Sequence, residues 1–275
     1  MKYSDKTPKR VVIKVGTSTL AHETGRLNLR RMESLTRVIS DLKNRGLEIV
    51  LVSSGAIGVG SGKLGLPSRP SDMPTKQAVA AVGQCELMYR YDKLFEEYNH
   101  TVAQVLLTRD VVDEQHRREN VINTFERLFA LHALPIVNEN DTVCVEEIES
   151  GGRFGDNDTL SALVSVLTKA DLLILCSDID GLYESDPHQN PDAGRFSCVG
   201  DLEAVKGLAG GSLSANGTGG MVTKLQAAEI CMAEEIDMVI LNGSNPELLY
   251  DLFDGKELAG TLFRKGAGNR MKSNH

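Results

Sequence analysis

The sequence has little cysteine and no long apolar run, and each shortage argues against a class of protein. Its five cysteines are scattered, odd in number and never spaced as Cys-x-x-Cys, which argues against a disulfide framework or a metal site. No apolar run approaches the roughly 20 residues that a membrane-spanning helix needs, and the first residues lack the apolar core of a signal peptide. We therefore expect a cytoplasmic protein with reduced thiols and no membrane partner.

Positive charge is also in short supply. The chain has 30 basic against 38 acidic residues and a formal net charge of −8, which works against non-specific binding to nucleic acid. An anionic ligand would therefore need local positive charge rather than a global field. With 275 residues the chain can bury one large core, and we expect a single domain over residues 1–275.

Short β-branched runs alternate with longer segments of helical periodicity from end to end. Strands are expected at 10–15, 47–52, 102–107, 134–137, 172–176 and 238–241, and helices at 28–45, 75–98, 120–131, 160–169 and 225–234. This alternation predicts an α/β fold whose mostly parallel sheet is covered by helices on both faces. The strand at 238–241 is expected to be the last of the core, and residues 265–272 a frayed tail.

A glycine-rich stretch, Gly217-Thr218-Gly219-Gly220-Met221-Val222-Thr223-Lys224, runs directly into a predicted helix. Glycines let backbone N–H groups approach an anion closely, and a helix N-terminus favours negative charge. Lys224 adds a full positive charge. The spacing is not that of a Walker loop, and an ordinary turn before a helix is the alternative interpretation. The stretch indicates a phosphate site.

Polar residues follow other predicted strands, and ligands gather beyond the carboxyl ends of strands in an open parallel sheet. Lys14, near the end of the first strand, either faces a phosphate or reaches water from a sheet edge. Ser54, after the second strand, either offers its hydroxyl to an anion or caps a helix.

Three further clusters are ambiguous on their own. Asn138-Glu139-Asn140-Asp141 either binds a ligand or forms a turn. Asp158 either caps the following helix or holds two lysines over a phosphate. Ser177-Asp178 and the loop after them either shape a nucleotide site, hold a metal or make a turn, and we favour the nucleotide.

Taken in order, these clusters resemble the amino acid kinase family, in particular its members that phosphorylate glutamate. The matching stretches are 12–18, 52–57, 136–141, 155–162, 177–183 and 217–224. The Gly-Asp-Asn-Asp and Gly-Thr-Gly-Gly-Met-x-Thr-Lys elements are the most specific of them. Many members carry a C-terminal PUA domain, and we expect none in this chain, which ends soon after residues 260–263.

The resemblance implies a three-layer α/β/α sandwich in which about 1–170 hold glutamate and about 171–265 hold ATP. It implies ATP- and Mg²⁺-dependent phosphorylation of the γ-carboxylate of L-glutamate to γ-glutamyl phosphate, the first step of proline biosynthesis. The expected partners are glutamate, ATP and further copies of the chain. The alternatives are an acetylglutamate, aspartate or uridylate kinase, or a non-catalytic nucleotide-binding protein on the same fold.

The resemblance also assigns roles to individual residues. Lys14 and Lys224 would contact the transferring phosphate, and Asp158 would organise both lysines. Glutamate would be bound by Ser54, Asn138, Asp141 and Asn157. ATP would be held by Lys14, Ser177, Asp178, Thr218, Gly219, Gly220, Met221, Val222, Thr223 and Lys224. A carboxylate nucleophile is already ionised near pH 7, so no catalytic histidine is expected.

Overall fold

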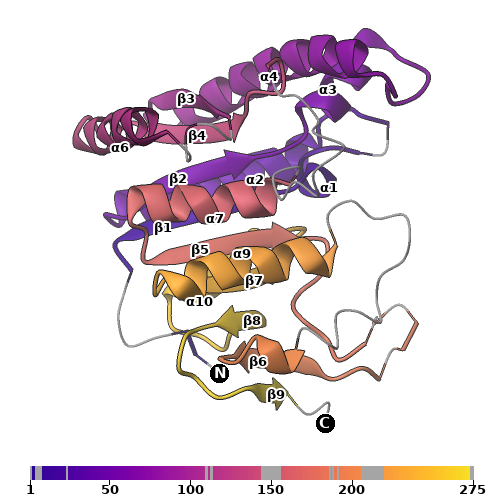
Figure 1. Ribbon diagram of the computed structural model, residues 1–275. Coiled ribbons are helices and arrows are strands. Elements are labelled where there is room, and N and C mark those ends of the chain that lie inside the picture. The colour runs from indigo at the N-terminus through magenta and orange to yellow at the C-terminus, as the bar shows by residue number, and fades with distance from the viewer. Residues whose placement is uncertain are drawn as a thin grey trace.

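One nine-stranded sheet runs through the described part of the chain. The computed structural model describes residues 2–3, 8–22, 24–108, 111, 114–143, 156–185, 187, 189–190, 192–205 and 220–272. The strand order is β3-β4-β2-β1-β5-β7-β8-β6-β9. Figure 1 shows β3 and β4 at one end of this sheet, β1 in its interior, and β6, β8 and β9 at the other end. Over the described residues, no helix combines the length and the hydropathy needed to cross a membrane.

The central strand, β1 (Arg10–Val15), pairs in parallel with β2 on one side and β5 on the other. The parallel part of the sheet consists of β1 with β2 (Glu48–Ser53), β3 (Val102–Leu107), β4 (Leu134–Glu139), β5 (Leu172–Ser177) and β7 (Asp237–Asn242). The mixed end consists of β6 (Arg195–Val199), β8 (Gly260–Phe263) and β9 (Arg270–Lys272). The mostly parallel sheet predicted from the sequence is therefore confirmed.

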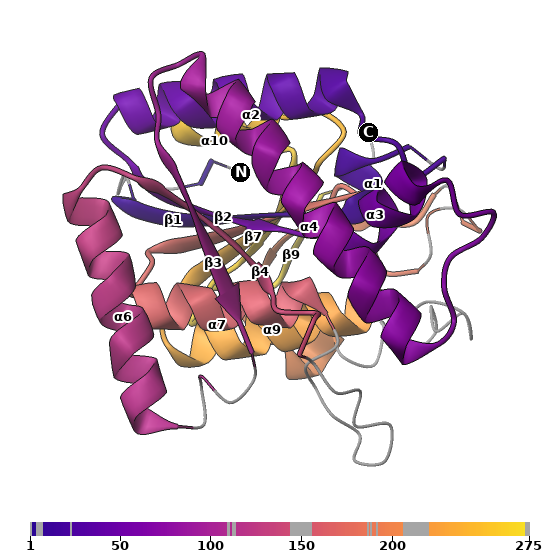
Figure 2. The ribbon, with the colours of Figure 1, turned by 90° about the horizontal axis from the view of Figure 1, so that it is seen from above.

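Helices cover both faces of the sheet, as Figure 2 shows. One apolar core lies under α2 (Leu29–Asn44), α4 (Met73–Glu96) and α10 (Leu248–Phe253), with the short α1 (Thr17–Leu20) beside it. The other lies under α6 (Gln115–Ala130), α7 (Asn157–Thr168) and α9 (Met221–Ala233). Successive residues of a strand face opposite sides, so β1 supplies Ile13 to the first core and Val12 to the second. This is the expected three-layer sandwich.

A close contact between two helix backbones places α3 (Ala56–Leu64) on α4. A Cβ atom added to Gly83 would lie 1.8 Å from the carbonyl oxygen of Ala56, and one added to Gly60 would lie 2.0 Å from that of Val79. No side chain fits at either position, because each carbonyl belongs to a helix backbone. The two glycines thus allow α3, which begins shortly after β2, to pack closely against α4.

Two expectations for the C-terminal part are wrong. The strand at 238–241 is not the last of the core, since the buried β8 follows it and pairs with it. The segment 265–272 is not a frayed tail, because its last residues form β9 and pair with β6. The sequence Arg270-Met271-Lys272 has no alternation of β-branched residues, so its local pattern did not reveal a strand that depends on its partner.

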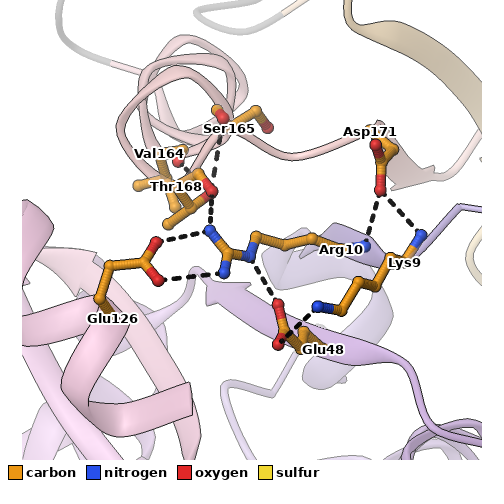
Figure 3. A network of polar contacts seen from close by, with 8 residues as sticks. All are labelled: Lys9, Arg10, Glu48, Glu126, Val164, Ser165, Thr168 and Asp171. Carbon is orange, nitrogen blue, oxygen red and sulfur yellow. Dashed lines mark hydrogen bonds and ion pairs between the residues drawn. The ribbon is translucent and has the colours of Figure 1, made fainter. Parts of the chain in front are cut away.

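A saturated polar network closes the amino end of the parallel strands (Figure 3). The guanidinium of Arg10 donates to Glu48 on β2 at 2.8 Å, to Glu126 on α6 at 2.7 Å, and to the carbonyl oxygen of Thr168 at the end of α7. It also lies 4.2 Å from the ring centroid of Phe129. One Arg10 side chain therefore links strands β1 and β2 with both neighbouring helices.

Candidate active site

The predicted site residues meet at the opposite, carboxyl end of the parallel strands. After β1 the chain forms β2, β3 and β4 on one side of β1. It then crosses to the other side, where β5 pairs with β1, so the direction in which strands are added reverses next to β1. Ligands of open α/β sheets bind beyond the strands at such a point. Helices α1 and α3 also begin there, and their N-termini favour negative charge.

Three charged side chains form a buried cluster at this point. Lys14 comes from β1, Asp158 from the first turn of α7 and Lys224 from the first turn of α9. The Nζ atom of Lys14 lies 2.6 Å from Oδ1 of Asp158, and that of Lys224 lies 3.1 Å from Oδ2. Exposure is 9% for Lys14, 1% for Asp158 and 6% for Lys224. Each carboxylate oxygen therefore has its own ammonium partner.

The cluster carries an excess of positive charge. Burial alone would raise the pKa of the Asp158 carboxyl, but the ammonium groups of Lys14 and Lys224 more than offset it, so this pKa lies below its ordinary value. Asp158 is then ionised and neutralises only one of the two lysines. The local positive charge that an anionic ligand would require is thus present, although the whole chain is acidic.

The geometry separates the alternatives left open for Lys14 and Asp158. Lys14 does not lie at a sheet edge, since β1 is paired on both sides. The N-cap of α7 is Asp156, whose side chain accepts from the backbone N–H of Asp158. Asp158 itself is the second residue of the helix and contacts both lysines. Their positions agree with the expected arrangement, and their catalytic roles stay predictions.

A cavity of about 1360 Å³ opens beside this cluster, on the side of β2 and β4. Its lining includes all four residues expected to bind glutamate, namely Ser54, Asn138, Asp141 and Asn157. Asn157 Nδ2 donates to Ser54 Oγ at 2.6 Å and lies 3.4 Å from Asn138 Oδ1. Side chains from three separate parts of the chain therefore form one continuous polar wall.

Ser54 is not a helix cap. The N-cap of α3 is Gly55, which adopts φ = 101°, a left-handed conformation that glycine reaches without steric cost. This turn leaves the Ser54 hydroxyl at the cavity, where it accepts from Asn157. The cluster around Asn140 does form a turn after β4, with Thr142 Oγ1 donating to Asn140 Oδ1 at 2.6 Å. Turn formation and a cavity position for Asp141 are therefore compatible.

Asp141 is a carboxyl group of this cavity whose pKa is far from its ordinary value. Burial, with a contribution from the negative charge of Glu139, raises the pKa of Asp141 from 3.8 to about 6. A cation bound next to it would lower this pKa again. Binding of a positively charged ligand group by Asp141 stays a prediction.

Apart from Lys14, the described residues that are expected to hold ATP lie at the end of β5 and the start of α9. Ser177 ends β5 and donates to the exposed Asp178 at 2.9 Å. Asp180 lies in the loop for which a metal site was the alternative interpretation. Its carboxylate pairs with Arg195 at 2.5 Å and accepts a hydrogen bond from the Tyr183 hydroxyl. Gly220 caps α9, whose first turn contains Met221, Val222, Thr223 and Lys224. Thr218 and Gly219 lie outside the described residues.

Two residues at the site received no role from the sequence, which also did not reveal one contact of a third. Thr223, which was expected only to hold ATP, also donates from Oγ1 to Asp158 at 3.1 Å. Asp156 lines the cavity with one buried carboxylate oxygen that has no hydrogen-bond partner among the described residues. Gln84, in the middle of α4, accepts from Asn138 at 2.9 Å, and nothing in its helical context distinguishes it.

Comparison with known proteins agrees with this geometry. The family model described as "Amino acid kinase family" matches residues 9–242. The chain is 54% identical to a protein named glutamate 5-kinase from Clostridium perfringens over 264 residues, 96% of this chain and 98% of that one. It is 55% identical to a protein of the same name from Listeria monocytogenes, over 96% of this chain and 95% of that one.

A solved structure shares the fold. The crystal structure of UMP kinase from Bacillus anthracis matches with a TM-score of 0.66 at 17% identity, over 97% of this chain and 100% of that one. At this identity the similarity concerns the arrangement of helices and strands alone.

Proposed function

The chain belongs to the amino acid kinase family, and on that premise we propose that it is a glutamate 5-kinase. The observation that carries the proposal is a site in which two lysines share one buried carboxylate, in a chain more than half identical to proteins of that name. The reaction transfers the γ-phosphoryl group of ATP to the γ-carboxylate of L-glutamate, as the first step of proline biosynthesis.

The transfer makes one bond and breaks one. A γ-carboxylate oxygen of glutamate attacks the γ-phosphorus of ATP, and the bond from that phosphorus to the bridging oxygen of the β-phosphate breaks. The products are γ-glutamyl phosphate and ADP. Glutamate side chains have an ordinary pKa near 4.3, so the nucleophile needs no general base at neutral pH.

Such a reaction brings several negative charges together, and its main requirement is positive charge at fixed positions. Lys14 and Lys224 provide it from two different elements of the fold, and Asp158 keeps their ammonium groups a few ångströms apart. Thr223 holds the second oxygen of that carboxylate as well. We expect both lysines to stabilise the transition state more than the ground state.

Glutamate would occupy the cavity lined by Ser54, Asn138, Asp141 and Asn157. In this proposal Asp141 pairs with the α-ammonium group, because a buried ammonium without a carboxylate partner is costly. An N-acetylated substrate has no such charge, so the same carboxylate would discriminate against it. The raised pKa of Asp141 supports this role, since it marks a carboxylate that no cation of the described residues compensates.

ATP would bind on the side of β5 and α9, at Ser177, Asp178 and the stretch from Thr218 to Lys224. The residues that the structure describes contain no cluster of three or more metal-binding side chains. This fits Mg²⁺ held mainly by phosphate oxygens and water, as is usual for this ion in kinases. Mg²⁺ would neutralise part of the phosphate charge.

Two accompanying expectations complete the proposal. We expect the enzyme to act in the cytoplasm, where its cysteines would stay reduced; Cys85, Cys176, Cys198 and Cys231 are free thiols in the structure. We also expect a homo-oligomer, which sedimentation of the purified protein would detect.

Trapping of the acyl phosphate tests the function directly. The protein is incubated with ATP, Mg²⁺ and hydroxylamine, together with L-glutamate, L-aspartate or N-acetyl-L-glutamate. We expect ATP-dependent hydroxamate with glutamate and little with the other acids. Equal or faster turnover of aspartate or N-acetylglutamate would contradict the proposed substrate and leave the fold unaffected.

A further inference from the structure

A chain of side-chain hydrogen bonds connects helix α4 to the glutamate cavity. It begins at Gln84, whose Oε1 accepts from Nδ2 of Asn138 at 2.9 Å. Oδ1 of Asn138 lies 3.4 Å from Nδ2 of Asn157, which also donates to Ser54 Oγ at 2.6 Å. Asn138 is only 3% exposed, so water has little access to the centre of this chain.

One backbone amide fixes the direction of the bonds. The N–H of Glu139 donates to Asn138 Oδ1 at 2.9 Å, and an N–H group can only donate. Asn138 must therefore turn its oxygen toward Glu139 and its NH₂ group toward Gln84. Gln84 can satisfy that NH₂ group only with its own oxygen. The amide orientations of Gln84 and Asn138 thus follow from the backbone.

The same logic extends to the cavity. Because Asn138 offers an oxygen to Asn157, the amide of Asn157 directs its NH₂ group toward Asn138 and Ser54, and its oxygen away from them. Ser54 accepts from Asn157, so its hydroxyl hydrogen can be donated elsewhere. A free amino acid needs an acceptor for its ammonium group and donors for its carboxylates. The chain of bonds leaves both kinds of group available.

We infer that Gln84 is a positioning residue for glutamate, acting through Asn138 on Asn157 and Ser54. This inference rests on the function proposed above. Without the Gln84 oxygen, the NH₂ group of Asn138 would be a buried donor without a partner, and it could escape that cost only by giving up the bond from Glu139. Asn138 would then adopt several orientations, and the groups facing glutamate would lose their fixed direction.

Two substitutions separate the acceptor from the shape of the side chain. Gln84→Met keeps the length and removes the acceptor, whereas Gln84→Glu keeps an oxygen at the same place. We expect Gln84→Met to raise KM for glutamate about five- to thirtyfold, with kcat and KM for ATP within about twofold of the parent. For Gln84→Glu, we expect kcat, KM for glutamate and KM for ATP all to lie within about threefold of the parent values. Cys85→Ala, at an exposed neighbour on α4, is the matched control and should leave every parameter unchanged.

A double-mutant cycle tests whether Gln84 acts through Asn138. In an Asn138→Ala background the substitution Gln84→Met should have little further effect on KM for glutamate, because the group it orients is gone. Additive effects would overturn the inference. So would a Gln84→Met enzyme with unchanged KM for glutamate, or one in which the unfolding midpoint, kcat and both KM values deteriorate together. The parent enzyme's hydroxamate assay decides the proposed function separately.

Discussion

The two ends of the parallel strands differ in how completely their charged side chains are paired. At the amino end, Arg10 is surrounded by Glu48, Glu126 and a helix carbonyl, and every partner is close enough to bond (Figure 3). At the carboxyl end, Asp158 is shared by two lysines, and Asp141 has an elevated pKa. The first end has its charges balanced within the protein. Among the described residues, the second end has one carboxylate for two lysines, and Asp141 has no ion-pair partner.

This difference indicates which end of the sheet serves function and which end serves stability. Buried charges that are fully paired contribute specificity to the fold, and removing one partner is costly. Buried charges that are left partly unpaired lower the stability of the folded protein. Binding of a complementary ligand raises that stability again. We therefore expect substitutions at the carboxyl end to change kinetics and substitutions at the amino end to change stability.

The largest effect should come from the two lysines. Lys14→Met and Lys224→Met should each lower kcat by roughly 30- to 1000-fold, equivalent to about 2–4 kcal/mol of lost transition-state stabilisation. Steady-state kinetics with saturating ATP and glutamate would measure this loss. Asp158→Asn should resemble them, because the lysines would lose their common partner. A variant with near-normal kcat and only a raised KM for ATP would show that its lysine merely binds nucleotide.

Asp141→Asn should come next. The substitution keeps size and hydrogen-bonding capacity and removes the charge proposed to meet the α-ammonium group. Losing a charge-assisted hydrogen bond costs about 1.5–3 kcal/mol, so KM for glutamate should rise roughly 10- to 150-fold. KM for ATP, measured on the same enzyme, should barely change. A KM for glutamate within about twofold of the parent would return Asp141 to a role in the turn after β4.

At the amino end, Arg10→Met should destabilise the fold by about 2 kcal/mol and leave the kinetics unchanged. The expected loss is smaller than for a completely buried pair, since Glu126 is half-exposed. Urea unfolding and the hydroxamate assay would be run on the same preparation. The control is Arg37→Met, which breaks the half-exposed pair with Glu247 and should cost less than about 1 kcal/mol. If Arg10→Met lowered kcat instead, the proposed division between stability at the amino end and kinetics at the carboxyl end would be wrong.

The smallest effect is a pH dependence. Asp141 has a pKa of about 6 in the free protein, and the ammonium group of glutamate would lower it. Protons therefore compete with glutamate, and its affinity should be complete above that pKa and decline below it. KM for glutamate should rise about tenfold from pH 7 to pH 5, a range in which the substrate γ-carboxylate stays largely ionised. Asp141→Asn should abolish this rise. A flat profile in the parent would exclude an ionised Asp141 from binding.

The sequence predicts the strands of the parallel part and the long helices α2, α4, α6, α7 and α9 because each carries its own signal, whereas it did not predict β6, β8 and β9. Lys14 was recognisable as a charge within an apolar run, and residues 155–158 as a polar motif before a helix. The assignment within that motif was less certain, since an aspartate that caps a helix and one that pairs with lysines differ only by position. Asp156 and Asp158 were distinguishable only once α7 was placed against β1 and α9.

Other features have no local signal at all. Gln84 occupies a polar position in a long helix, and only the packing of α4 against the sheet brings it to Asn138. Arg10 looks like an ordinary first residue of a strand, although it contacts α6 and α7. β9 depends on β6, which is far from it in the sequence. Such long-range contacts are fixed by the tertiary fold, which sequence periodicity does not encode.

The position of β6 also matters while the chain is being synthesised. Both strands that pair with it, β8 and β9, follow it in the sequence. At roughly 5–20 residues per second, a ribosome would release β6 several seconds before its partners. During that interval both of its edges lack the strands that later cover them, and an uncovered strand edge can recruit another chain. Until β8 and β9 have emerged, β6 is therefore a strand at which the nascent protein can pair with another chain.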